Sequence, residues 1–89
     1  MKNVKTIRLS KNTEPAKACT SLLFMLEEGN DVELIALGTS AAVLAKVAAL
    51  SFNLSYGKMT LSYHPRMEVI HDSQGIPRSA VIMLIKAVP

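Results

Sequence analysis

The sequence predicts one two-layer α+β domain, with element order β-α-β-α-β-β and a mixed four-stranded sheet that carries both helices on one face. The chain has 89 residues, of which 49% are hydrophobic, so it can build one core and no second domain. Four strand-like stretches alternate with two stretches of helical period. Strands joined by a helix run parallel, whereas the last two are separated by a short loop and must be antiparallel. The domain is expected to span residues 1–89.

The first strand and helix follow from hydrophobic spacing. Residues 4–10 alternate, so Ile7 and Leu9 share one face of a half-buried strand. A helix is predicted over residues 14–28, with Asn12 or Thr13 as its cap and Pro15 in its first turn. Gly29 is suited to end that helix in the left-handed conformation. The apolar stripe of the helix consists of Cys19, Leu22, Leu23 and Leu26.

The second strand and helix occupy the middle of the chain. Residues 31–37 are almost continuously apolar, which is typical of a strand at the centre of a sheet. Thr39 or Ser40 is expected to cap a second helix from residue 41 to about residue 52. Its predicted core stripe is Val43, Leu44, Val47 and Leu50. The opposite face is smooth enough for another helix or a backbone to approach closely, and it carries Ala42, Lys46, Ala49 and Asn53.

The last two strands complete the sheet. Residues 59–64 alternate, and Pro65 is expected to end or bulge this strand, with residues 67–71 able to extend it. Residues 72–77 have the composition of a loop, and residues 78–88 have high β-propensity. The inward positions of the third strand are Met59, Leu61 and Tyr63. The sheet face away from the helices is expected to be polar, with Arg8, Ser10, Glu33, Thr60, Ser62 and His64.

Composition excludes several classes of protein. The aromatic content of 4%, without tryptophan, excludes a surface built from many stacking rings. A single cysteine, Cys19, excludes an intrachain disulfide, and the polar, basic opening has no apolar signal segment, so a cytoplasmic location is expected. The longest apolar-rich run, residues 41–50, is much shorter than the roughly 20 residues that a bilayer crossing requires. No membrane association is therefore expected.

The net charge of +3 hides a polarised chain. Residues 1–17 carry five bases and one acid, residues 18–45 carry four acids and no base, and residues 46–89 carry five bases and two acids. The clearest electrostatic feature is the basic series Lys2, Lys5, Arg8 and Lys11. This series fits a surface that meets a polyanion, and it equally fits a solvated edge strand whose charges prevent aggregation.

Signals for catalysis and cofactors are weak. The nucleophile and base candidates Cys19, Ser40, His64 and His71 belong to no recognisable catalytic motif, so no enzymatic activity is expected. The two histidines with Asp72 lack a metal-ligand spacing, so neither a metal nor another cofactor is expected. Backbone N–H groups at residues 38–40 could hold a phosphate. Because the glycine spacing and lysine of nucleotide-binding loops are absent there, a plain helix cap is the favoured interpretation.

Three segments of the chain resemble one protein family. Residues 33–50 combine a strand, a glycine turn and an alanine-rich helix with one lysine, and they resemble the core of the stage V sporulation protein S family, which is related to the Alba chromatin proteins. Residues 78–85 are similar to the last strand of that family. So is the opening at residues 7–10, which is followed by a helix containing the sequence Pro-Ala-Lys-Ala at residues 15–18. The resemblance covers nearly the whole chain.

This resemblance implies an Alba-like fold, a homodimer, a regulatory role in development and binding to DNA or RNA without sequence specificity. The binding surface would include the loop after the first strand, the start of the second helix and the hairpin between the last strands. Carried over by position, the implied contacts are Lys11, Lys17, Ser40, Lys46 and Arg78, to which the basic first strand adds Arg8.

Two other functions compete with nucleic-acid binding. The smooth alanine face of the second helix and the apolar parts of the sheet would suit a protein-interaction or regulatory module, in which the basic residues serve solubility. An enzyme or small-ligand protein would need a deep pocket around Ser40, His64 or His71.

Overall fold

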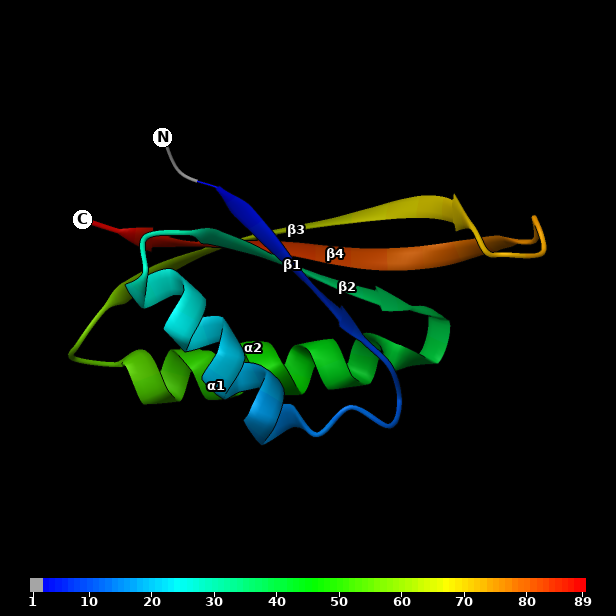
Figure 1. Ribbon diagram of the computed structural model, residues 1–89. Helices are drawn as coiled ribbons and strands as arrows, with labels where there is room; N and C mark the ends of the chain where they lie inside the picture. The colour runs from blue at the N-terminus through cyan, green and yellow to red at the C-terminus, as the bar shows by residue number, and fades with distance from the viewer. Residues whose placement is uncertain (1–2) are drawn as a thin grey trace.

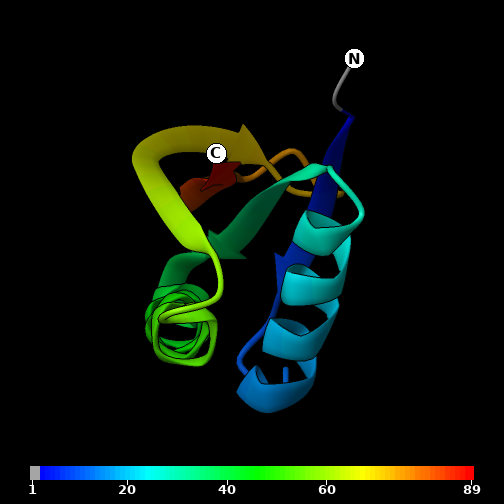
Figure 2. The ribbon, with the colours of Figure 1, turned by 90° about the vertical axis from the view of Figure 1, so that its left-hand side faces the viewer.

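The computed structural model, which describes residues 3–89, has the predicted two-layer architecture (Figures 1 and 2). The strands lie in the order β1-β2-β4-β3, with β1 parallel to β2 and with β4 antiparallel to both of its neighbours. Both helices cover one face of this sheet (Figure 2). The elements are β1 (Val4–Leu9), α1 (Pro15–Glu27), β2 (Asp31–Leu37), a 3-10 turn (Gly38–Ser40), α2 (Ala41–Ser55), β3 (Thr60–His71) and β4 (Pro77–Val88).

The hydrophobic core lies between the sheet and the two helices. Strand β2 has a neighbour on each side, as predicted for its apolar sequence, and alternate residues of it point into the core. The predicted stripe of α1 meets them, and burial raises the pKa of the Cys19 thiol. The buried core cluster comprises Leu9, Ala18, Cys19, Leu22, Leu26, Val32, Leu34, Ala36, Leu44, Val47 and Ile85.

Helix α1 starts differently from the prediction and ends as predicted. Neither Asn12 nor Thr13 caps it, because the Thr13 hydroxyl accepts the backbone N–H of Ser10 at 2.8 Å and so closes the preceding turn. At the other end Gly29 has φ +91°, and its N–H donates to the carbonyl of Leu26 at 3.0 Å. A second bond from the next residue to Met25 completes a left-handed helix stop.

Helix α2 departs from the prediction at both ends. The 3-10 turn begins at Gly38, whose φ is +53°, so Ser40 is already helical and forms no side-chain cap. The helix runs to Ser55 rather than to about residue 52. Its buried side includes Ser51 and Ser55, whereas the predicted Val43 and Leu50 are half-buried. The Ser51 hydroxyl is satisfied there by the Ala48 carbonyl at 2.7 Å and the Tyr63 hydroxyl at 2.8 Å.

Strand β3 continues through Pro65, which was expected to end or bulge it. The strand pairs with β4 without interruption from Thr60 opposite Val88 to His71 opposite Pro77. It is an edge strand, and a proline at an edge leaves the ladder intact when its nitrogen faces away from the neighbouring strand. The predicted strand and its extension are therefore one element.

The hairpin formed by β3 and β4 projects beyond the rest of the sheet. Strand β2 makes its last pair with β4 at Leu37 opposite Ala80. The paired residues beyond that point, together with their loop, form the hairpin arm, defined here as residues 69–79 (Figure 1). On the side of the sheet that faces the helices, Met67 and Val69 are 73% and 67% exposed. The side of the sheet that faces the helices thus continues into the arm, where no helix covers it.

Candidate nucleic-acid interface

Three segments implied in binding lie at one end of the molecule. The register of the sheet places Leu9, the last residue of β1, opposite Ala36, and Ala36 opposite Val81. The loop after β1, the 3-10 turn and the hairpin arm therefore leave the sheet at the same end (Figure 1).

Lys46 lies where the first turn of α1 approaches α2. Lys46 is exposed on the smooth face of α2 and lines an open groove of about 510 Å³. The groove is lined by Glu14, Pro15, Ala16, Lys46, Ala49, Leu50 and Asn53. Lys17 also belongs to the first turn of α1, and its ammonium lies 3.5 Å from the Glu14 carboxylate. The smooth face predicted to admit a close neighbour is approached by the start of α1.

The cations at this end outnumber their acidic partners. Within residues 3–89, Arg8, Lys11 and Lys46 form no ion pair. The two nearby acids are already engaged, Glu14 with Lys17 and Asp72 with Arg78. The acidic pair that ends α1, residues 27–28, lies about 20 Å along the helix from its start. The two acids that end α1 therefore lie away from the cations near its start.

Arg8 is separated from the lysines by the sheet. It lies opposite Ile35 on β2, which in turn lies opposite Ile82 on β4. These positions alternate with the core-facing residues and belong to the open face, which no helix covers. The structure therefore places Arg8 on the face of the sheet opposite to the helices, which carry Lys17 and Lys46.

Arg78 lies in the hairpin arm and is held by Asp72. Its Nε donates to Oδ2 of Asp72 at 3.2 Å. Oδ1 of the same carboxylate accepts the backbone N–H groups of Gln74 at 2.9 Å and Ile76 at 3.0 Å. These bonds, first of all the one from Ile76, lower the pKa of Asp72 below its ordinary value. The loop of the arm is thus organised around one carboxylate that also balances the charge of Arg78.

The 3-10 turn contributes Thr39 rather than Ser40 to the surface. Thr39 is exposed, and with Leu37 and Gly38 it faces Asp72 and Arg78 across an open hollow of about 410 Å³. Ser40 is buried. Ser40, the contact that the resemblance implies, is therefore inaccessible, whereas its neighbour Thr39 is accessible.

The order of the arm loop should depend on pH through Asp72. Because the pKa of Asp72 is lowered in the folded protein, its stabilising contribution is complete above the ordinary aspartate range and is lost as the pH falls through the lowered pKa. Amide hydrogen exchange at Gln74 and Ile76 should accelerate over that acidic range. Asp72→Asn should accelerate both amides at neutral pH, whereas Ser73→Ala should not. Equal protection in the wild type and Asp72→Asn would contradict this account.

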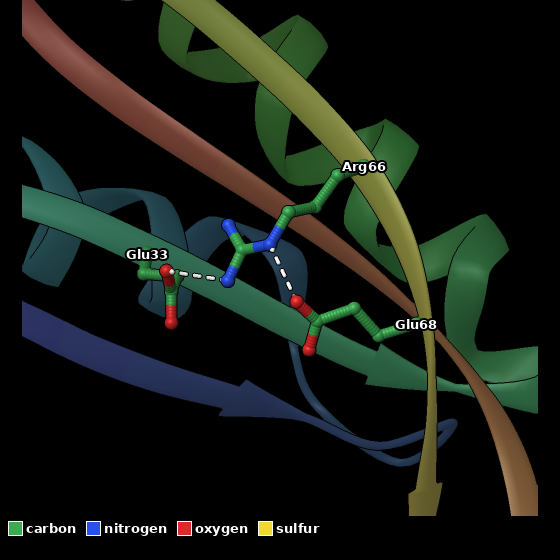
Figure 3. A network of polar contacts seen from close by, with 3 residues as sticks. All are labelled: Glu33, Arg66 and Glu68. Carbon is green, nitrogen blue, oxygen red and sulfur yellow. Dashed lines mark hydrogen bonds and ion pairs between the residues drawn. The ribbon is translucent and has the colours of Figure 1, made fainter.

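Sequence reasoning missed an ion-pair network on the open face of the sheet (Figure 3). Arg66 on β3 donates through Nε to Glu68 at 3.0 Å and through Nη2 to Glu33 at 3.3 Å. Since β4 lies between β3 and β2, the Arg66 side chain crosses over β4 to reach Glu33. The signal was present in the sequence, because the outward alternation of residues 60, 62 and 64 continues to 66 and 68. It was lost when the strand was expected to end or bulge at Pro65.

Two further kinds of feature were looked for in the part of the chain that the structure describes, a metal site and a membrane-spanning helix. Within residues 3–89 there is no group of three or more His, Cys, Asp or Glu side chains arranged to hold a metal ion. No helix in that range combines the length and apolar character needed to cross a membrane. No protein-family model and no curated protein matches this chain.

Proposed function

We propose that this protein is a small dimeric nucleic-acid-binding protein that contacts phosphates in the cytoplasm through Lys11, Lys17, Lys46 and Arg78, with Arg8 on the adjoining face. It catalyses no reaction. The observations that carry the proposal are that the loop after β1, the 3-10 turn and the hairpin arm leave the sheet at one end, and that Arg8, Lys11 and Lys46 form no ion pair among residues 3–89. The resemblance described above adds a regulatory role in development.

The chemistry of these residues fits contact with the nucleic-acid backbone. Lysine ammonium groups act as point charges toward phosphate and carry no base-reading geometry. Arg78 is already bonded to Asp72, so the arm brings little net charge. Binding should therefore be weak, independent of sequence and steeply dependent on salt.

A salt-dependent titration tests this function. Fluorescence anisotropy should detect binding to duplex DNA, single-stranded DNA or RNA at about 50 mM salt. With four or five phosphate contacts on duplex DNA, log K should fall against log salt with a slope of about −4. The same titration with the three probes gives the preference among them. Absence of binding to all three at low salt would remove the proposal.

An exposed apolar cluster supports a protein-interaction module as a second candidate. Phe52 and Tyr56 lie with ring centroids 6.3 Å apart near the end of α2, and Leu54 is exposed between them in sequence. Beside them Met59 and Leu61 line a hollow of about 210 Å³. A protein partner whose binding is lost in Phe52→Ala and Tyr56→Ala, together with no affinity for nucleic acid, would favour this candidate.

A further inference from the structure

The outer edge of β3 is a long strand edge that has no partner strand among residues 3–89. The strand has 12 residues and pairs only with β4. The backbone N–H of Asp72 donates to the carbonyl of Ile76 at 3.0 Å, which continues the β3–β4 ladder and makes the even-numbered residues of β3 the ones that bond to β4. The nitrogen of Pro65 and the backbone groups of residues 61, 63, 67, 69 and 71 therefore face outward. The chain thus offers a nearly complete row of donors and acceptors to another strand.

The side chains along this edge differ between the two faces of the sheet. On the helix side, Met67 and Val69 are largely exposed. On the open side, Arg66 and Glu68 stand two residues apart, and each side chain is about half exposed. Charged residues and proline are devices that blunt an edge strand, and this edge carries both, but it also exposes the aliphatic side chains of Met67 and Val69 at its centre.

We propose that a second copy of this chain pairs antiparallel with the outer edge of β3, with the two-fold axis at Met67. Arg66 then faces the partner's Glu68, and Glu68 faces the partner's Arg66. On the helix side, Met67 faces the partner's Met67, and Val69 faces the partner's Pro65. The two four-stranded sheets become one eight-stranded sheet with an arm on each side of the axis.

The charges select this register. An axis through Arg66 sets two arginines opposite each other, and an axis through Glu68 sets two glutamates opposite each other, both of which are unfavourable. An axis through Pro65 places Arg66 opposite a histidine and leaves Glu68 opposite a serine. An axis through Val69 places Glu68 opposite an isoleucine and Arg66 opposite Asp72, which is already bonded to Arg78. Only the axis at Met67 gives both opposite-charge pairs and the apolar pairs together.

The dimer of the proposed function would form through this edge, and the expectation of a dimer is the one point taken from that proposal. None of the proposed phosphate contacts takes part in it, because all of them, Arg8, Lys11, Lys17, Lys46 and Arg78, lie outside β3. Its test contains no nucleic acid, so its failure is distinguishable from failure of the binding proposal.

Charge reversal with a mixing experiment tests the register. Sedimentation velocity should show the wild type as a dimer, and Arg66→Glu and Glu68→Arg should each weaken dimerisation about tenfold or more, because each places like charges opposite each other twice. An equimolar mixture of the two variants should recover the dimer, since glutamates on one chain then face arginines on the other. If the substitutions weakened the dimer only by breaking ion pairs within each chain, mixing the two variants would not recover it. A monomeric wild type, dimers that resist both substitutions, or a mixture that does not recover would overturn the proposal.

A cross-link provides a second measurement. Hydrogen-bonded pairs in antiparallel sheets have Cα atoms about 5.5 Å apart, which a disulfide can span. Met67→Cys should therefore form a covalent dimer on mild oxidation. Phe24→Cys, an exposed position on α1, is the matched control, and both variants retain the buried Cys19. Cross-linking that is absent from Met67→Cys, or equal in the two variants, would contradict the interface.

Discussion

Leu22→Ala is expected to lower the free energy of unfolding by about 2–5 kcal/mol. Leu22 is fully buried in the stripe of α1 that packs against the sheet, so the substitution removes apolar contacts and leaves a cavity. For a small domain whose total stability is about 5–10 kcal/mol, this is a large fraction. Urea unfolding followed by circular dichroism measures the change.

The matched control is Leu54→Ala. Leu54 lies in α2 and is 55% exposed, so its replacement by alanine should change stability by about 0.5 kcal/mol or less. Similar losses in the two variants would show that the core does not lie where the structure places it.

The double variant Lys11→Glu/Lys46→Glu is expected to lose about a hundredfold in affinity for nucleic acid at low salt, from two charge-assisted phosphate contacts removed. The magnitude of the salt slope should fall by about 2. Both side chains are exposed, so the fold should be unaffected. Anisotropy titrations of the wild type and the variant over one salt series measure both quantities.

Lys58→Glu is the control for net charge. Lys58 is exposed in the turn after α2, at the end of that helix remote from the 3-10 turn (Figure 1). It changes the total charge as much as either single reversal while leaving the candidate interface intact. If Lys58→Glu weakens binding as much as Lys11→Glu or Lys46→Glu alone, net charge rather than the interface governs affinity.

Much of the fold could be predicted because the apolar spacing of each element is local information. The position of β2 at the sheet centre and the stripe containing Leu22 both followed from such spacing. The structure differs from the prediction where a contact between distant parts of the chain determines the burial or the conformation of a residue. Ser51 is buried because Tyr63, twelve residues away, supplies a hydrogen-bond partner. Pro65 stays within a strand because β3 has only one neighbour, a property of the whole sheet.

The candidate site was predictable to a smaller extent. The exposure of Lys46 followed from the helical period, and its place beside the first turn of α1 fits the smooth face around it. The bond between Arg78 and Asp72 depends on the conformation of the arm loop, which turn-rich composition alone does not specify. Burial of Ser40 depends on the 3-10 geometry that starts at Gly38.

The position of β4 between β2 and β3 also affects how the chain folds. β4 follows every other element in the chain, yet it holds the two halves of the sheet together. While the chain emerges from a ribosome, β1, α1, β2 and α2 can associate, but one edge of the apolar strand β2 remains open until β4 arrives. Such late, long-range pairing slows folding and exposes an aggregation-prone edge. The nascent domain is therefore most vulnerable to misassembly just before β4 is inserted.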